Sequence, residues 1–128
     1  MKILLIEDDP GTVEVLKFCF DIYKPDATLI PTTIGREGIK LARHADPDGI
    51  IIDLGLPDMN GVDVIREIRD FSDVPVLISS ARTEDETFAA VQASGADDFI
   101  TKPYDLEELM TKLDQLVIDK PRLAVTKY

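Results

Sequence analysis

The sequence predicts an α/β domain built on an open parallel sheet, because short apolar runs alternate with helical patterns along the chain. The runs are rich in Ile, Val and Leu and do not alternate with polar residues, which is typical of strands buried on both faces of a sheet. Apolar residues at helical spacing occupy the segments between them. Five strands and five helices joined by right-handed crossovers therefore make one doubly wound domain.

The predicted strands are five short segments of Val, Ile or Leu character. They are residues 3–6, 28–30, 50–52, 76–79 and 99–100. In an open parallel sheet, ligands bind outside the carboxyl ends of the strands. The residues that follow these five runs are therefore the first place to look for a functional site.

The first helix follows Asp9 and Pro10, a favourable N-cap and a favourable first helical residue, and places Val13, Leu16 and Phe20 on one face. The fifth helix opens at Asp105 with Glu108 and has the clearest pattern of all. Its apolar residues follow at helical spacing: Leu106, Leu109, Met110, Leu113, Leu116 and Val117.

The middle helices have weaker patterns. The second is predicted around residues 39–42, and Gly35 and Gly38 loosen it. The third is marked by apolar residues at positions 62, 65 and 68. The fourth opens with a capping box over residues 83–86, and its apolar face is thin, with Phe88, Val91 and several alanines.

Composition and charge limit the function classes. A chain of 128 residues with 45% hydrophobic and 30% charged residues can bury one core, and we expect a domain over residues 1–118 and a C-terminal tail or linker stub over residues 119–128. A net charge of −11 disfavours direct binding of nucleic acid. The apolar run near the N-terminus is too short for a signal peptide or membrane span, so we expect a cytoplasmic protein. The single cysteine, Cys19, excludes an internal disulfide and is expected to be a buried thiol.

Polar residues follow four of the predicted strands at the edge where ligands bind. They are Glu7, Asp8 and Asp9, then Asp53, then Ser79 and Ser80, then Thr101, Lys102 and Pro103. Converging carboxylates repel one another and are driven to take up protons, and a hard divalent cation removes that repulsion. Mg²⁺ fits oxygen ligands of this kind, and no His or Cys lies nearby in sequence to favour zinc.

Each of these residues also has a simpler interpretation. Asp9 before Pro10 fits a helix N-cap better than a metal ligand. Glu7 or Asp8 alone fits a solvated loop acid, Ser80 a hydroxyl bonded to backbone, and Lys102 a surface lysine. Asp53 is the hardest to explain in this way, because an apolar run precedes it and a Gly-Leu-Pro turn follows it.

Four segments in order resemble the receiver domain of bacterial and archaeal two-component response regulators. They are "ILLIEDDP", "IIIDLGLPDMNG", "VPVLISSAR" and "GADDFITKPYDLEELM", which together span nearly the whole chain. The resemblance implies a flavodoxin-like (βα)5 fold whose five strands lie in the order 2-1-3-4-5. It also implies a signalling domain that accepts a phosphoryl group and is not an enzyme acting on other substrates.

The resemblance assigns roles to individual residues. Asp53 matches the phosphoacceptor that takes a phosphoryl group from a sensor histidine kinase or a phosphotransfer protein. Glu7, Asp8, Asp53 and the backbone carbonyl of Gly55 match the ligands of Mg²⁺, which would offset charge on the transferring group. Lys102 matches the lysine that pairs with Asp53 and then with a phosphate oxygen.

Further matches concern the switch and the output. Ser80 matches the hydroxyl that bonds the phosphoryl group, and Phe99 matches an aromatic residue that swings inward behind it; packing of Phe99 against the fourth helix is the simpler interpretation. Pro103 matches a proline that often follows a cis bond. The output is expected through the face formed by helix 4, strand 5 and helix 5. Residues 82 and 55 match positions that modulate autodephosphorylation.

The same face forms a phosphorylation-dependent homodimer in a subclass of transcription factors, where helix 5 carries arginines. Lys112 and Asp114 stand at the comparable positions here. A downstream effector is expected, and its identity is open.

Three other functions are conceivable for such a chain. A Mg²⁺-dependent phosphohydrolase that uses Asp53 as nucleophile usually carries a second acid two residues later, where this chain has Gly55. A degenerate receiver that only binds partners is disfavoured by the complete set of site residues. A nucleotide-binding fold ranks low because the chain has neither G-x-G-x-x-G nor a P-loop.

Overall fold

The sheet observed in the computed structural model, which describes residues 1–119, has five parallel strands in the order β2-β1-β3-β4-β5. This confirms the fold class and the strand order expected from the sequence. The strands are β1 (Lys2–Ile6), β2 (Thr28–Thr32), β3 (Gly49–Asp53), β4 (Val76–Ser80) and β5 (Asp98–Thr101). The helices are α1 (Pro10–Tyr23), α2 (Gly35–His44), α3 (Gly61–Arg69), α4 (Glu84–Ser94) and α5 (Leu106–Asp119).

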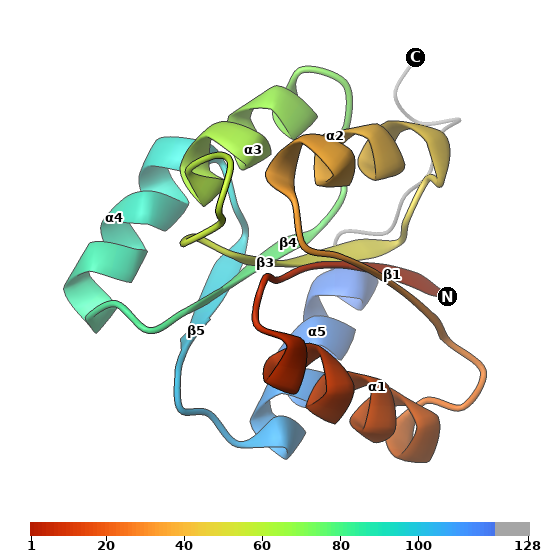
Figure 1. Cartoon of the computed structure of the whole chain (residues 1–128). Coiled ribbons are helices and arrows are strands. Elements are labelled where there is room, and N and C mark those ends of the chain that lie inside the picture. Colours follow the sequence, from red (N-terminus) through yellow and green to blue (C-terminus); the bar gives the residue numbers. More distant parts are fainter. Residues whose placement is uncertain (120–128) are drawn as a thin grey trace.

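Helices cover both faces of the sheet. Figure 1 shows α1 and α5 on one side and α2, α3 and α4 on the other. Two apolar cores result, one on each face, and β3 contributes to both because Ile50 and Ile52 point into one core and Ile51 into the other. These three residues are fully buried, as the continuous apolar run predicted.

The N-terminus of α1 forms as the sequence predicted. The Asp9 carboxylate accepts hydrogen bonds from Gly11 N at 3.4 Å, Thr12 N at 3.3 Å and Thr12 Oγ1 at 2.7 Å, which confirms the N-cap interpretation. These bonds lower the pKa of Asp9, with the Thr12 hydroxyl as the largest cause. Cys19 is buried on the inner side of the same helix, and burial raises the pKa of its thiol.

The two glycines of α2 have a different role from the one the sequence suggested. A Cβ on Gly38 would lie 2.5 Å from Ile6 Cδ1, and a Cβ on Gly35 would lie 2.8 Å from Val64 Cγ2. The helix forms over both positions. Glycine is therefore the residue that allows α2 to approach β1 and α3 closely, and it does not mark a loose segment.

Helix α4 has the weakest apolar face of the described helices. Phe88, which we expected on the inner face, is 53% exposed. The buried positions carry the small residues Thr87, Ala90 and Ser94. The Thr83 hydroxyl accepts a hydrogen bond from Glu86 N at 3.2 Å and caps the helix as predicted.

The described chain ends in α5 at Asp119, so the tail expected at its C-terminus lies almost wholly outside the described residues. Among residues 1–119, no helix combines the length and the apolar character that crossing a membrane requires.

Candidate functional site

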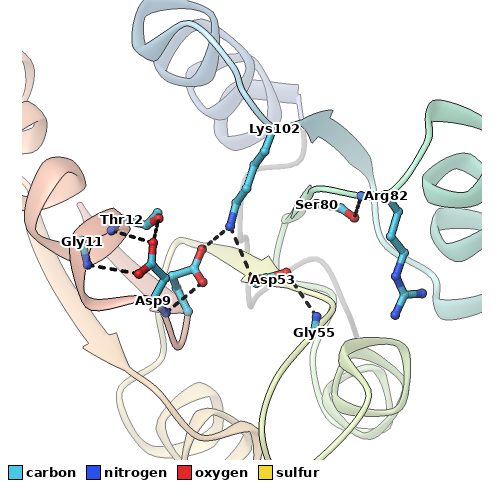
Figure 2. Close-up of polar contacts among 9 residues, drawn as sticks. Asp9, Gly11, Thr12, Asp53, Gly55, Ser80, Arg82 and Lys102 are labelled. Carbon is cyan, nitrogen blue, oxygen red and sulfur yellow. Dashed lines mark hydrogen bonds and ion pairs between the residues drawn. The ribbon is translucent and has the colours of Figure 1, made fainter.

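Three charged side chains from distant parts of the chain meet at the carboxyl edge of the sheet. Glu7 directly follows β1, Asp53 ends β3 and Lys102 directly follows β5. Strands β1 and β3 are neighbours with Ile6 opposite Ile52, so the two acids emerge side by side. Figure 2 shows Lys102 reaching across from the far strand to this point.

Lys102 is shared between two carboxylates. Its Nζ lies 2.7 Å from Glu7 Oε1 and 3.4 Å from Asp53 Oδ2. The resemblance pairs Lys102 with Asp53, and the structure shows this contact together with a closer one to Glu7. The lysine therefore bridges the two acids.

Burial makes this arrangement electrostatically demanding. Glu7 is only 2% exposed, and its loss of solvent, opposed by Lys102, raises the pKa of its carboxyl above the ordinary 4.5. Burial disfavours the charged form of Lys102 too, but its hydrogen bond to Glu7 and the attraction of Asp53 raise its pKa. The lysine therefore stays charged throughout the physiological range.

The site holds more negative than positive charge. Glu7, Asp8 and Asp53 each offer one carboxylate oxygen, and these oxygens lie within 4.8 Å of one another. Asp8 is exposed, so this cluster opens to solvent. Hard oxygen ligands at this spacing, with one lysine against three acids, fit Mg²⁺ or another hard divalent cation.

The loop after Asp53 is tightly built. The Asp53 Oδ1 atom accepts a hydrogen bond from Gly55 N at 3.1 Å, and Gly55 pairs with Asn60 across the loop in an antiparallel bridge. A Cβ at Gly61 would lie 2.7 Å from Leu54 Cα and 2.8 Å from the Asp53 carbonyl oxygen. Only glycine fits there, so the loop folds back against the strand that carries Asp53.

The predicted switch residues lie on the neighbouring strands. Ser80 is buried at the end of β4, where its hydroxyl accepts a hydrogen bond from Arg82 N at 3.0 Å (Figure 2). Phe99 lies opposite Ile78 in the sheet and is half-buried against the core beneath α2, α3 and α4. Phe99 therefore packs as the simpler interpretation expects, and its inward swing stays a prediction.

The segment after β5 completes one wall of the site. The Lys102–Pro103 peptide bond is cis, as the resemblance implies. Tyr104 follows it, and burial raises the pKa of its phenol. A groove of about 710 Å³ lies between this segment and α1, and Lys102 and mostly apolar residues line it.

Sequence reasoning missed one polar residue near the site. The Asp58 carboxylate, in the loop after Asp53, accepts hydrogen bonds from Gly35 N at 2.7 Å and Arg36 N at 3.0 Å. These are the first N–H groups of α2, whose own N-cap position is Ile34 and provides no side-chain bond. A helix without a capping residue in its own sequence was the signal that could have indicated an acceptor elsewhere in the chain.

Comparisons with known proteins agree with this geometry. A family model described as "Response regulator receiver domain" matches residues 3–114. The cell cycle transcriptional regulator CtrA of Caulobacter vibrioides is 36% identical over 123 residues, which cover 91% of this chain and 50% of that protein. The KDP operon transcriptional regulatory protein KdpE of Escherichia coli is 44% identical over 112 residues, covering 88% of this chain and 49% of its own length.

Solved structures show the same architecture. The signal receiver domain of a signal transduction histidine kinase from Syntrophus aciditrophicus superposes with a TM-score of 0.81 at 28% identity, covering 95% of this chain and 93% of that one. The receiver domain of a Francisella response regulator gives a TM-score of 0.83 over 92% of this chain and 97% of that one, and at 24% identity it supports the fold alone. The chain spans about half the length of the two curated regulators that it matches.

Proposed function

The chain belongs to the response regulator receiver domain family, and we propose that it accepts a phosphoryl group on Asp53. The observation that carries the proposal is the sharing of Lys102 between Glu7 and Asp53 at a rim where carboxylates exceed cations. The excess of carboxylates at this rim attracts Mg²⁺, and Mg²⁺ together with Lys102 attracts an anionic phosphoryl group.

Asp53 is the proposed nucleophile. One of its carboxylate oxygens forms a bond to phosphorus, and the bond from phosphorus to the donor nitrogen or oxygen breaks, so that the donor leaves with the electron pair. Mg²⁺, held by Glu7, Asp8, Asp53 and the Gly55 carbonyl, would supply positive charge that offsets the charge of the transferring group. The reaction is then mostly a matter of positioning and electrostatics.

Lys102 and Ser80 have complementary roles in this proposal. The Lys102 ammonium already lies between Glu7 and Asp53, so it needs only a small movement to pair with an oxygen of the bound phosphoryl group. The Ser80 hydroxyl at the next strand end can donate a hydrogen bond to another oxygen. Both groups would hold the product.

The proposed donor is a phosphohistidine on a sensor kinase or a phosphotransfer protein. A second groove on α1 shares Val15 and Leu106 with the groove beside Lys102. Val15, Phe18 and Ile22 line it at helical spacing and are at least half exposed. An apolar face that leads to the phosphoacceptor suits a protein donor that must place a side chain at Asp53.

The proposed switch couples Ser80 to α4. The Ser80 hydroxyl accepts from Arg82 N, and α4 begins two residues later with a face of small side chains. A hydroxyl that turns toward the phosphoryl group gives up this bond and frees the start of α4, with Phe99 of β5 packed behind it. The proposal also includes an output through α4, β5 and α5, a phosphorylation-dependent homodimer and a downstream effector.

A small phosphodonor tests the proposal without the kinase. The chain is incubated with acetyl phosphate and Mg²⁺, and its intact mass is measured. We expect one acid-stable, base-labile phosphoryl adduct on the wild type and on the surface variant Asp63→Asn, and none on Asp53→Asn or with EDTA. Absence of any adduct would favour a degenerate receiver, and steady release of phosphate from many phosphoesters without an adduct would favour a phosphohydrolase.

A further inference from the structure

The tip of the loop after Asp53 is hydrogen-bonded to the N-terminus of α2. The Asp58 carboxylate accepts from Gly35 N at 2.7 Å and from Arg36 N at 3.0 Å, using one oxygen for each. These bonds lower the pKa of Asp58, with the Arg36 N–H as the largest cause, so the carboxylate is charged when it caps α2. The contact spans 23 residues of sequence.

The packing around this contact allows little play. A Cβ on Gly35 would lie 2.8 Å from Val64 Cγ2, 3.3 Å from Asp58 Oδ1 and 3.4 Å from Leu56 Cδ1. Leu56 comes from the same loop and packs against the core beneath α2. The start of α2 therefore touches the loop both through the capping carboxylate and through an apolar neighbour.

The base of the same loop carries the groups that define the site. Gly55 donates its N–H to Asp53 and pairs with Asn60, so residues 56–59 are the turn that closes this bridge. Asp58 lies within that turn. A turn that is fixed at its tip restricts the directions that the Gly55 carbonyl can take.

We propose that Asp58 is a positioning residue, which fixes the loop after Asp53 through the N-terminus of α2 and so orients the Gly55 carbonyl for Mg²⁺. This inference rests on the proposed function. It predicts that the loop and the start of α2 form one unit: release of Asp58 exposes the first N–H groups of α2 and loosens the cation site at the same time.

The experiment compares Asp58→Ala with two matched variants. Asp58→Asn keeps the shape and one acceptor oxygen but removes the charge. Glu67→Gln weakens the 3.0 Å ion pair between Arg36 and Glu67, which also joins α2 to α3 but does not touch the loop. Mg²⁺ affinity is measured by calorimetry, and amide exchange is followed at Gly35, Arg36 and Gly55 without Mg²⁺, at a temperature where circular dichroism shows every variant folded.

We expect Asp58→Ala to weaken Mg²⁺ binding about tenfold, the lower end of the range for groups that orient metal ligands. Amide exchange should speed up at Gly35, Arg36 and Gly55 together. Asp58→Asn should lie between this variant and the wild type, and Glu67→Gln should match the wild type in both measurements.

Two results would overturn the inference alone. The first is a Mg²⁺ affinity of Asp58→Ala that equals that of the wild type. The second is amide exchange that becomes faster at Gly35 and Arg36 but stays at the wild-type rate at Gly55. A wild-type chain that neither binds Mg²⁺ nor takes up a phosphoryl group would overturn the proposed function, and this inference with it.

Discussion

Two clusters of mostly half-buried charge lie at opposite edges of the sheet, and their charges are balanced differently. At the amino edge, Arg69 pairs with Asp97 at 3.0 Å and also donates to the carbonyl oxygens of Gly95, Ser72 and Val74. The same Asp97 oxygen accepts from Val76 N at 2.8 Å. At the carboxyl edge, Lys102 faces Glu7 and Asp53, with Asp8 close by.

The contrast lies in what each cluster leaves unsatisfied. Arg69 has one acid for its charge and three backbone carbonyl oxygens for further donors, so the charges of the amino-edge cluster are balanced within the chain. The carboxyl-edge cluster has an excess of acids, and burial raises the pKa of Glu7 there. A cluster whose charges are balanced indicates a structural role. A cluster with an excess of acids indicates a binding site for a cation.

The largest effect is expected from a substitution that breaks the balanced cluster at the amino edge. Arg69→Leu removes the ion pair to Asp97 and the hydrogen bonds to three backbone carbonyl oxygens, so it should lower the free energy of unfolding by about 3 kcal/mol. The measurement is urea denaturation at neutral pH. Because this edge lies away from Asp53, the folded variant should still accept a phosphoryl group from acetyl phosphate; loss of the adduct in folded protein would show that the two edges are not separate in function.

The next largest effect is expected when Mg²⁺ binds the carboxyl-edge cluster and offsets its excess of acids. Mg²⁺ at one hundred times its dissociation constant should raise the free energy of unfolding by about 2.7 kcal/mol, because it binds only the folded chain. Thermal or urea denaturation with and without Mg²⁺ measures this gain. The double variant Glu7→Gln, Asp8→Asn should lose most of the gain, and a gain of the same size in that variant would place the cation elsewhere.

A smaller effect follows from removing one acid of the excess. In the absence of Mg²⁺, the free energy of unfolding of Asp53→Asn should lie within about 1 kcal/mol of the wild-type value or above it. The substitution relieves repulsion from Glu7, and Lys102 keeps its closer partner. Urea denaturation in EDTA gives the comparison. Destabilisation comparable to that of Arg69→Leu would mean that Asp53 is structural.

The smallest effect is a pH dependence. The pKa of Glu7 is raised above 4.5 in the folded chain, so the folded state binds this proton more tightly than the unfolded state does. Glu7 therefore opposes folding increasingly as the pH rises from 4.5 through its folded-state pKa. In metal-free buffer, the stability of Glu7→Gln relative to the wild type should grow over this range. A constant difference between the two would contradict the raised pKa.

The sequence predicted most of the fold because strong local patterns and the global topology agree. The Ile50–Ile52 run, the Asp9 cap and the pattern of α5 each specify their element locally. Gly35 and Gly38 were misread because a helix propensity counts only local cost, whereas these glycines permit contacts with β1 and α3 that are distant in sequence. Phe88 was misplaced for a related reason, since the inner face of α4 carries small residues, two of them polar, that a hydrophobic pattern does not register.

The site was predictable in membership but not in detail. Strand ends located Glu7, Asp53 and Lys102 at one edge, because parallel strands finish together. The closer pairing of Lys102 with Glu7 depends on side-chain reach, and the capping of α2 by Asp58 depends on how a loop meets a helix. Neither leaves a pattern within a short window of sequence.

The most direct measurement of the central claim is the position of the phosphoryl bond. After reaction with acetyl phosphate and Mg²⁺, borohydride reduces an aspartyl phosphate to homoserine, and peptide mass spectrometry locates the reduced residue. We expect homoserine at position 53, with Glu7 and Asp8 unchanged. Reduction at another residue, with position 53 unchanged, would contradict the account.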